Sequence, residues 1–421
     1  MLPFLKINFA LALLLFAVSV HVNAQNVGDL RLQAGVADSF GINVDFMEPK
    51  RGELRMIAAA GFRWVRVEFK WDVIEKAKGT YDFAQYDRLL AALDTESLRP
   101  LFVLGYVNPL YDNGTSPHTE AGRRAFANWA VAAAKHFANR GVLWELYNKP
   151  NDSRYWQPQP NVNDYIQLAL EVSKQFRATV PAERLIGPAT SGIDFDFLEA
   201  CFKAGLLQYW SAISVHPYRM EPPETVVPGY NRLRDLIKSY KQGSEKDTAI
   251  ISSEWGYSSV WSGMTDDKES EYLVRQWLVN LGNGVPISIW YSWRDGKDLQ
   301  DIDQGFGTVT FQYGQKRAYL AAKALTSFLS GYKLVKRFDV GGSDDFVFLF
   351  QNGAESRVVA WGTTMRAHRV VVPLGAGKYE LTNHLGDALE PVIALTPDVP
   401  IEITSSPTYV KFLEAIKTKK K

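Results

Sequence analysis

The sequence predicts an α/β fold, a (β/α)₈ barrel followed by a small C-terminal β-sandwich. Up to about residue 330, short apolar runs alternate with longer amphipathic stretches. The apolar runs begin near residues 40, 64, 100, 142, 184, 212, 248 and 285. The intervals of 24 to 42 residues between them each hold one strand, one helix and two loops. Eight such units are what a closed barrel requires, and the functional groups of such barrels gather at the C-terminal ends of the strands.

The barrel strands are predicted from β-prone apolar runs, and the helices from apolar residues spaced by three and four. The predicted strands cover residues 40–44, 64–69, 100–105, the run from 142, 184–187, 212–216, 248–253 and 285–290. The clearest helices cover 53–61, 83–93, 120–139, 163–180 and 316–329. A doubly wound open sheet has the same alternation. No Gly-rich phosphate loop follows the first strand, which favours the barrel.

The pattern changes after the last of these helices. Strand-like runs at 346–350, 357–361, 368–372, 379–381 and 399–403 are separated by turn residues and not by helices. Short strands in this arrangement are typical of a β-sandwich. We therefore expect a barrel domain over residues 25–330 and a β-sandwich with a basic tail over 331–421.

The first 24 residues have the features of a secretory signal. Lys6 precedes an apolar run over residues 7–20, and Val22-Asn23-Ala24 offers small residues at the cleavage positions. A membrane anchor is the alternative, but the run is short for a membrane span. We expect export to the periplasm or the extracellular space, a mature chain that begins at Gln25, and no membrane association after cleavage.

Composition excludes several classes of function. Lys and Arg number 47 and Asp and Glu 46, and removal of Lys6 with the signal makes the balance equal. A neutral chain offers no electrostatic case for nucleic acid or an anionic membrane. The single Cys201 excludes an intramolecular disulfide, and the six His residues lack metal-ligand spacing. We expect no metal and no cofactor.

Two predicted strands end in polar residues of the types that act in catalysis. The fourth runs from Val142 into Asn148 and Lys149, and the seventh ends in Glu254. Strand alternation predicts that Glu145, Tyr147 and Lys149 share one face unless a bulge intervenes. Lys149 and Glu254 are 105 residues apart, about three strand–helix units, so both strand ends lie at the same barrel mouth. Taken alone, Glu254 is better explained by an ion pair at a strand end.

The barrel region, residues 36–330, resembles the retaining glycoside hydrolases of clan A, with family 39 and family 5-like features. In that clan the fourth strand ends in Asn-Glu-Pro and the seventh in a nucleophilic Glu. The motifs that carry the resemblance are Tyr147-Asn148-Lys149-Pro150-Asn151, Ser253-Glu254-Trp255-Gly256-Tyr257, His216-Pro217-Tyr218 and Trp290-Tyr291-Ser292-Trp293-Arg294-Asp295.

The resemblance implies roles for single residues. Glu254 would be the nucleophile, and Asn148 would hold the 2-hydroxyl of the sugar. Arg66 and Tyr218 would orient Glu254, and Trp290 would form a sugar platform. The substrate-binding residues that it implies are Asn148, Arg66, His216, Tyr218, Trp290, Trp255 and Trp71.

This sequence departs from the pattern at Lys149, which stands where the clan has its acid/base Glu. Retaining hydrolysis needs two carboxyl groups about 5–5.5 Å apart. An ammonium group with the ordinary Lys pKa of ~10.4 is a poor proton donor near neutral pH. We expect Lys149 to form an ion pair with Glu254 and to reduce activity. Glu68 is a better substitute than Glu145, which lies deeper along its strand.

Tryptophan supplies a separate argument for a carbohydrate ligand. Aromatic rings suit the C–H faces of sugars. Core packing is the better explanation for any single Trp, and the cluster at one end of the barrel is what favours a sugar cleft. The Trp residues at or just past predicted strand ends are Trp71, Trp156, Trp255, Trp261, Trp290 and Trp293.

Three functions follow as hypotheses. The first is an exported retaining glycosidase that acts on a poly- or oligosaccharide and is impaired by Lys149. The second is a non-hydrolytic carbohydrate-binding protein on the same barrel. The third is a Schiff-base lyase that uses Lys149 as an amine nucleophile.

Overall fold

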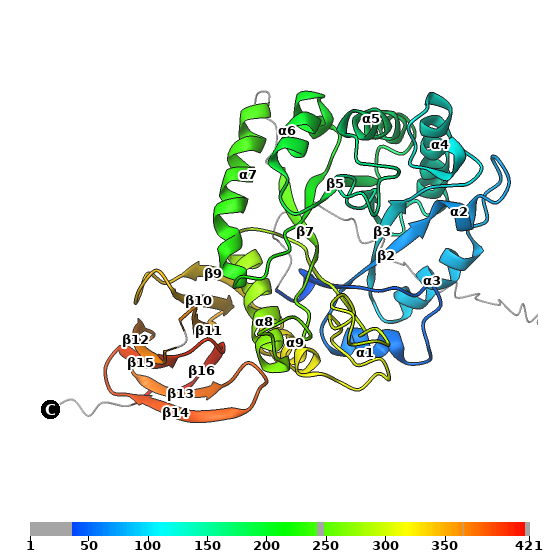
Figure 1. Ribbon diagram of the computed structural model, residues 1–421. Coiled ribbons are helices and arrows are strands. Elements are labelled where there is room, and N and C mark those ends of the chain that lie inside the picture. The colour runs from blue at the N-terminus through cyan, green and yellow to red at the C-terminus, as the bar shows by residue number, and fades with distance from the viewer. Residues whose placement is uncertain (1–35, 242–247, 365, 417–421) are drawn as a thin grey trace, which may run out of the picture.

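The computed structural model describes residues 36–241, 248–364 and 366–416 (Figure 1). The predicted secretory signal and the basic tail at 417–421 lie outside the described residues.

Eight parallel strands close into a barrel, as the sequence predicts. Strand β1 pairs with both β2 and β8, which closes the sheet. The strands are β1 (Phe40–Asn43), β2 (Trp64–Lys70), β3 (Arg99–Gly105), β4 (Leu143–Leu146), β5 (Arg184–Ser191), β6 (Ala212–His216), β7 (Ala249–Trp255) and β8 (Ser288–Trp290).

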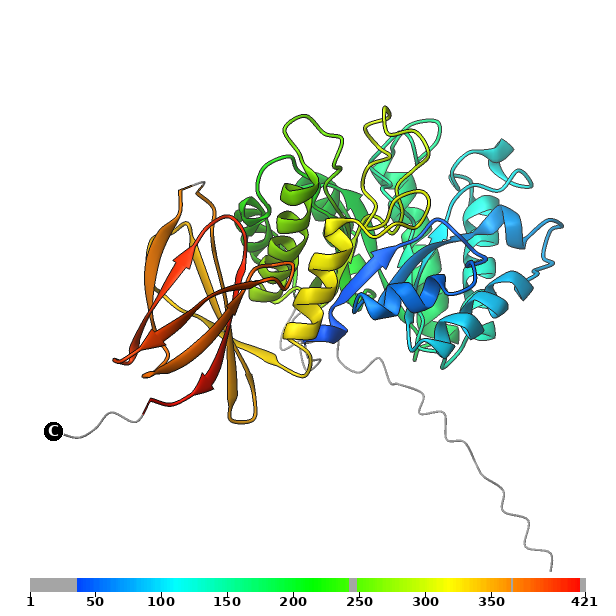
Figure 2. The same cartoon turned by 90° about the horizontal axis from the view of Figure 1, so that it is seen from below.

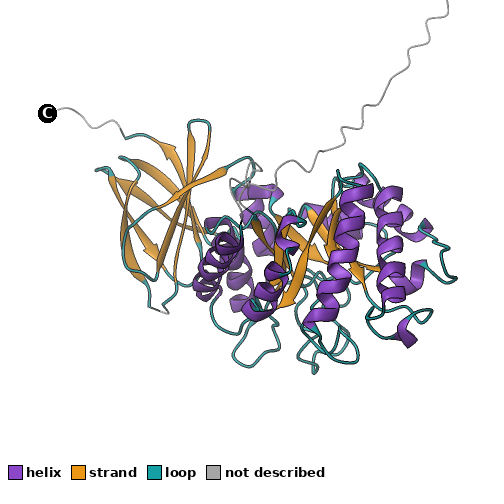
Figure 3. Cartoon of the chain, turned by 90° about the horizontal axis from the view of Figure 1, so that it is seen from above, coloured by secondary structure: helices purple, strands orange, loops and turns teal. Residues whose placement is uncertain are grey.

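Helices surround the barrel (Figure 3). Side chains cap several of them: Thr119, Asn161, Asp194 and Thr265 each accept a bond from a first-turn backbone N–H. The α-helices are α1 (Glu53–Ala59), α2 (Trp71–Ile74), α3 (Ala84–Thr95), α4 (Glu120–His136), α5 (Val162–Thr179), α6 (Phe195–Lys203), α7 (Val227–Tyr240), α8 (Asp266–Gly282) and α9 (Arg317–Phe328). Short 3₁₀ turns are η1 (Val36–Asp38), η2 (Asp112–Gly114), η3 (Leu206–Gln208) and η4 (Pro223–Val226).

The barrel interior changes from apolar to polar along the strands. Side chains alternate between the two faces of a strand, so every second residue enters the interior. Trp64 on β2 and Ile251 on β7 belong to an apolar layer near the strand starts. Arg66 and Glu145 lie one step further along β2 and β4 and are buried. The polar layer therefore lies at the C-terminal end of the barrel.

The C-terminal region is all β, as predicted. A six-stranded antiparallel sheet has the order β14-β13-β16-β11-β10-β9, and β12 pairs with β15. A second apolar core fills the space between them. The strands are β9 (Lys333–Arg337), β10 (Asp345–Asn352), β11 (Glu355–Gly362), β12 (His368–Pro373), β13 (Gly377–Thr382), β14 (Ala388–Ala394), β15 (Asp398–Ile403) and β16 (Thr408–Glu414).

The β-sandwich packs against the barrel beside α8 and α9 (Figures 1 and 2). Arg275 on α8 donates to both oxygens of Glu224 on η4, with N–O distances of 2.8 and 2.7 Å. The Trp361 Nε1–H of β11 donates to the same carboxylate at 2.7 Å. His384 contacts Ser270 of α8 at 2.8 Å. Buried polar contacts therefore join the two domains.

Candidate active site

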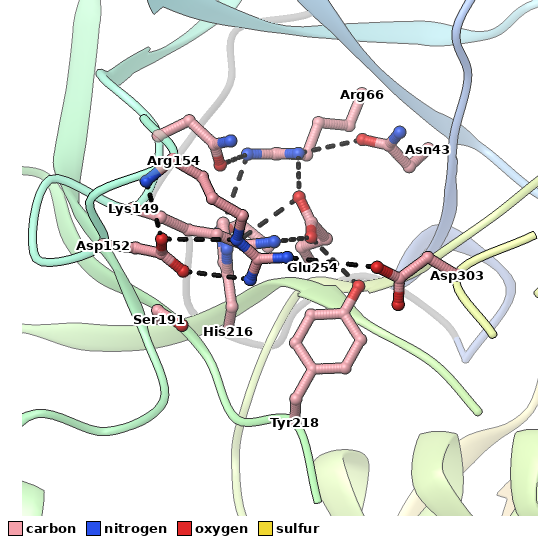
Figure 4. A network of polar contacts seen from close by, with 12 residues as sticks. Asn43, Arg66, Lys149, Asp152, Arg154, Ser191, His216, Tyr218, Glu254 and Asp303 are labelled. Carbon is pink, nitrogen blue, oxygen red and sulfur yellow. Dashed lines mark hydrogen bonds and ion pairs between the residues drawn. The ribbon is translucent and has the colours of Figure 1, made fainter. Parts of the chain in front are cut away.

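Glu254 lies at the barrel mouth, on a strand with a bulge. Between β7 and β8 the pairing shifts from Ser252 opposite Ser288 to Trp255 opposite Trp290, so β7 has one extra residue. A bulge re-aims the side chains that follow it. It turns Glu254 into the barrel, where the side chain contacts groups from β2, the end of β4 and the end of β6 (Figure 4).

Three donors hold the Glu254 carboxylate. Arg66 Nη1 lies 2.7 Å from Oε2, while Lys149 Nζ and Tyr218 Oη lie 2.6 and 3.0 Å from Oε1. Burial raises the pKa of Glu254, but the charges of Lys149 and Arg66 outweigh it and hold the pKa well below its ordinary value. Glu254 is therefore ionised at neutral pH.

Arg66 connects most of the polar layer. Its Nε donates to Glu145 at 2.8 Å, Nη1 also donates to Asn43 at 2.9 Å, and Nη2 donates to Asn148 at 2.9 Å. Burial lowers the pKa of Arg66, but Glu145 and Glu254 raise it above the ordinary value. A permanently charged guanidinium thus fixes the positions of Glu254 and Asn148.

The backbone after β4 departs from strand geometry. Tyr147 and Lys149 have positive φ angles of 69° and 46°, a conformation that non-Gly residues rarely adopt. The predicted alternation is therefore wrong beyond Leu146. Tyr147 turns away to contact Ser116 Oγ at 2.8 Å, whereas Asn148 and Lys149 both reach the polar layer.

The predicted ion pair between Lys149 and Glu254 is present. The Lys149 ammonium also lies 5.1 and 5.2 Å from the ring centres of Tyr155 and Tyr218, within the range of cation–π attraction. Its side chain is 10% exposed. The ammonium therefore occupies the space directly beside the carboxylate.

His216 ends β6 and Tyr218 lies two residues later, and the two side chains differ in role. Tyr218 donates to Glu254, and burial, reinforced by Glu254, raises its pKa, so the hydroxyl keeps its proton. His216 is fully buried and lies 3.0 Å from Ser253 Oγ and 3.5 Å from Arg66 Nη2. Burial lowers the pKa of His216 and leaves it neutral. His216 therefore supports the layer below the mouth, and its predicted contact with substrate is wrong.

The predicted tryptophan platforms are also wrong. Trp71, Trp255 and Trp290 are each at most 1% exposed, so none has an open ring face. Trp255 and Trp290 belong to the core between strands and helices. Trp290 lies there because Ile287 and Ile289 take the inward positions of the eighth strand run. Trp71 packs in the same layer against the ring of Tyr111.

Tyrosines outside the predicted substrate-binding set provide the partly exposed rings at the mouth. Tyr106 follows β3, Tyr155 lies in the loop after β4, and Tyr291 follows β8. Tyr106 and Tyr291 stand directly after the last residues of their predicted strand runs. This position could have indicated that their side chains lie at the barrel mouth.

A cavity of about 360 Å³ lies beside the Glu254 cluster, within the usual size of a small-molecule site. Asn43, which accepts from Arg66, joins the cavity to the cluster. Arg154 from the loop after β4 reaches toward Asp303 on the far side, with a 3.9 Å N–O distance (Figure 4). The lining residues include Asn43, Asp45, Tyr291, Arg294, Asp303 and Phe311.

Neither a metal site nor a membrane span is found within the described ranges. No group of three or more His, Cys, Asp or Glu side chains there could hold a metal ion. None of the helices in that part of the chain is both long and apolar enough to cross a membrane.

The architecture is thus a (β/α)₈ barrel with a C-terminal β-sandwich and a polar cluster at the barrel mouth. No protein-family model and no curated protein matches the sequence. Solved structures are similar in fold. A family 39 glycoside hydrolase from Bacteroides cellulosilyticus WH2 is 24% identical, with a TM-score of 0.78 over 90% of this chain and 82% of that chain.

Two further structures are similar at lower identity. A family 39 β-xylosidase from Caulobacter crescentus is 18% identical, with a TM-score of 0.68 over 92% of this chain and 99% of its own. A family 30 endoxylanase from Clostridium papyrosolvens C71 is 13% identical, with a TM-score of 0.64 over 92% and 99%. These similarities establish the two-domain fold.

Proposed function

We propose that the chain is an exported glycoside hydrolase that cleaves O-glycosidic bonds of a poly- or oligosaccharide by a retaining mechanism, with activity reduced by Lys149. The observation that carries this proposal is the Glu254 carboxylate, ionised and held at the barrel mouth by Arg66 and Tyr218. The similar structures are glycoside hydrolases of families 39 and 30, which supports the same class.

In the proposed reaction Glu254 is the nucleophile. Its carboxylate attacks the anomeric carbon, the bond to the leaving oxygen breaks, and a glycosyl ester forms on Glu254. Arg66 and Tyr218 keep the carboxylate in place and need no rearrangement as the reaction begins. Asn148, fixed by Arg66, is the proposed partner of the sugar hydroxyl next to the reacting carbon.

Lys149 limits this reaction in two ways. Its ammonium is bonded to Oε1 of Glu254 and must move before a sugar can approach that oxygen. It also stands where a carboxylic acid would protonate the leaving oxygen. A glycoside with a good leaving group needs no such proton, whereas a natural sugar leaving group does.

A mechanism-based fluorosugar with a dinitrophenyl leaving group tests the proposal. Incubation should add one glycosyl group to the protein, and peptide mapping should place it on Glu254. The Glu254→Gln variant should remain unlabelled under the same conditions. Label on another carboxylate, or on none across a panel of sugars, would refute the nucleophile assignment.

The close Lys149–Glu254 pair also favours a second candidate, a non-hydrolytic carbohydrate-binding protein. In that case oligosaccharides should bind to the wild type and to Glu254→Gln, and no aryl glycoside should be cleaved. Calorimetry with a panel of oligosaccharides, run beside the rate assay, separates the two candidates. The Schiff-base hypothesis finds no support here, because an ammonium paired with a carboxylate is no nucleophile.

A further inference from the structure

Glu68 is a carboxylate at the barrel mouth that the proposed reaction has not used. It lies two residues after Arg66 on β2, so the two side chains share the inner face of the strand. Arg66 contacts Glu254, and Glu68 stands one step nearer the opening. The Glu68 side chain is 39% exposed, so solvent and ligand can reach it.

A directed series of hydrogen bonds connects Glu68 to the Glu254 cluster. Asn148 Oδ1 accepts from Arg66, so its amide nitrogen faces Tyr106 and donates to the Tyr106 hydroxyl at 3.0 Å. That hydroxyl donates in turn to Glu68 Oε1 at 2.6 Å. Each donor and acceptor in the series is thereby assigned. Glu68 Oε2 takes no part in it, and its neighbour is the Lys70 ammonium at 3.4 Å.

Two carboxylates that line the cavity, Asp45 and Asp303, are exposed and pair loosely with Arg294 and Arg154 instead of with the Glu254 cluster. The remaining described carboxylates around the mouth are fixed by other partners. Glu145 is fully buried and bonded to Arg66, and Asp295 is buried and bonded to Lys316. Asp152 accepts both side-chain bonds of Arg154. Glu68 is therefore the described carboxylate that combines exposure with a bonded connection to Glu254.

We propose that Glu68 is the general base of the second half of the reaction, in the role that Lys149 cannot fill. This inference rests on the proposed function and deepens it. Water attacks the anomeric carbon of the glycosyl ester, its proton passes to the Glu68 carboxylate, and the bond between that carbon and the Glu254 oxygen breaks. The products are the free sugar, the Glu254 carboxylate and a protonated Glu68, which returns its proton to solvent.

The first half of the reaction remains limited by Lys149. Lys149 must leave Oε1 of Glu254 before the glycosyl ester can form, whereas the second step begins after that displacement. Glu68 can therefore serve the second step without supplying the acid of the first. Activated glycosides should be turned over through Glu68, while natural glycosides remain slow.

The experiment uses the full chain and the dinitrophenyl glycoside that the wild type turns over fastest. In Glu68→Gln the first release of dinitrophenol should persist as a burst, and steady turnover should fall by ~10²–10⁴-fold. Azide should restore the turnover of Glu68→Gln and yield a glycosyl azide of retained configuration, with little effect on the wild type. The matched control is Glu380→Gln, since Glu380 on β13 of the β-sandwich is 50% exposed and pairs with Lys411 at 3.6 Å.

The outcomes separate the two proposals. Turnover in Glu68→Gln equal to the wild type would overturn the role of Glu68. So would a loss of both burst and turnover that azide does not restore, because a positioning or binding role would produce it. No turnover of any aryl glycoside by the wild type, with no fluorosugar label on Glu254, would instead refute the proposed function itself.

Discussion

Two buried Arg–carboxylate clusters in this molecule have opposite designs. At the domain interface, Arg275 directs its donors at both oxygens of Glu224, and Trp361 completes the contact. At the barrel mouth, Arg66 divides its donors among four partners and leaves one oxygen of Glu254 to Lys149 and Tyr218. The first cluster is closed and holds domains together. The second leaves one oxygen of Glu254 bonded to Lys149, which reaches the cluster from the loop after β4.

The largest expected effect comes from removing the carboxylate at the mouth. Glu254→Gln should lower kcat on an activated glycoside by on the order of 10³-fold or more, as expected when a nucleophile that acts with its neighbours is lost. Steady-state rates with one dinitrophenyl glycoside measure it. A variant that retains the wild-type rate would show that Glu254 at the barrel mouth is not the nucleophile.

The same substitution in the closed cluster should affect stability instead. Glu224→Gln leaves Arg275 buried without its counter-charge, and breaking a buried pair in this way typically costs about 3–5 kcal/mol. Urea denaturation measures the change. Glu199→Gln, in an exposed pair with Lys203, serves as the control and should unfold like the wild type. Unchanged stability in Glu224→Gln would mean that the interface does not depend on this contact.

The interface should also weaken in acid through His384. Burial, and then the charge of Arg317, lower the pKa of His384 to about 4. The unfolded chain, with an ordinary His pKa near 6.5, therefore binds more protons, and stability falls as the pH falls from about 6.5 to about 4. The loss amounts to roughly 3 kcal/mol for this pKa difference. Denaturation of His384→Asn across that range should show a shallower dependence; an identical slope would contradict the assignment.

The smallest effect expected is a gain at the mouth. Lys149→Glu should raise the rate on an unactivated oligosaccharide by at least ~10²-fold, the lower end of acid–base assistance. One rate assay with the same oligosaccharide compares both forms. Equal rates would show that another group already protonates the leaving oxygen. Lys149 would then not limit the rate of hydrolysis.

Much of the fold could be predicted because its signals are local. The barrel strands are continuous β-prone runs, and their number and spacing indicate closure. The pairing of Lys149 with Glu254 followed from the same topology, since the ends of the fourth and seventh strands meet at one mouth. Strands β9, β14 and β16 were not predicted, because β9 and β14 are mostly exposed and β16 is exposed over its second half, so none has a clear apolar pattern.

The direction of side chains at the mouth depends on features that no local pattern encodes. The bulge in β7 turns Glu254 inward, and nothing in the composition of that strand announces it. The positive φ angles of Tyr147 and Lys149 likewise change which residues reach the mouth. The predicted sugar platform at Trp290 was wrong for a different reason. Side chains alternate along a strand, and Ile289 points inward, so the ring of Trp290 lies among the helices.

The contacts between the domains have a consequence for how the chain folds. Helix α8 connects β7 to β8, and its Ser270 and Arg275 find partners in or beside the β-sandwich. At the other end, the Val36 amide donates to the Tyr332 carbonyl, so the start of the barrel is fastened to the segment that leaves it. A chain shortened after Leu329 would lose the β-sandwich residues that contact α8. Helix α8 directly follows β7, the strand that carries Glu254. We therefore expect the two domains, which the sequence pattern separates, to unfold as one cooperative unit.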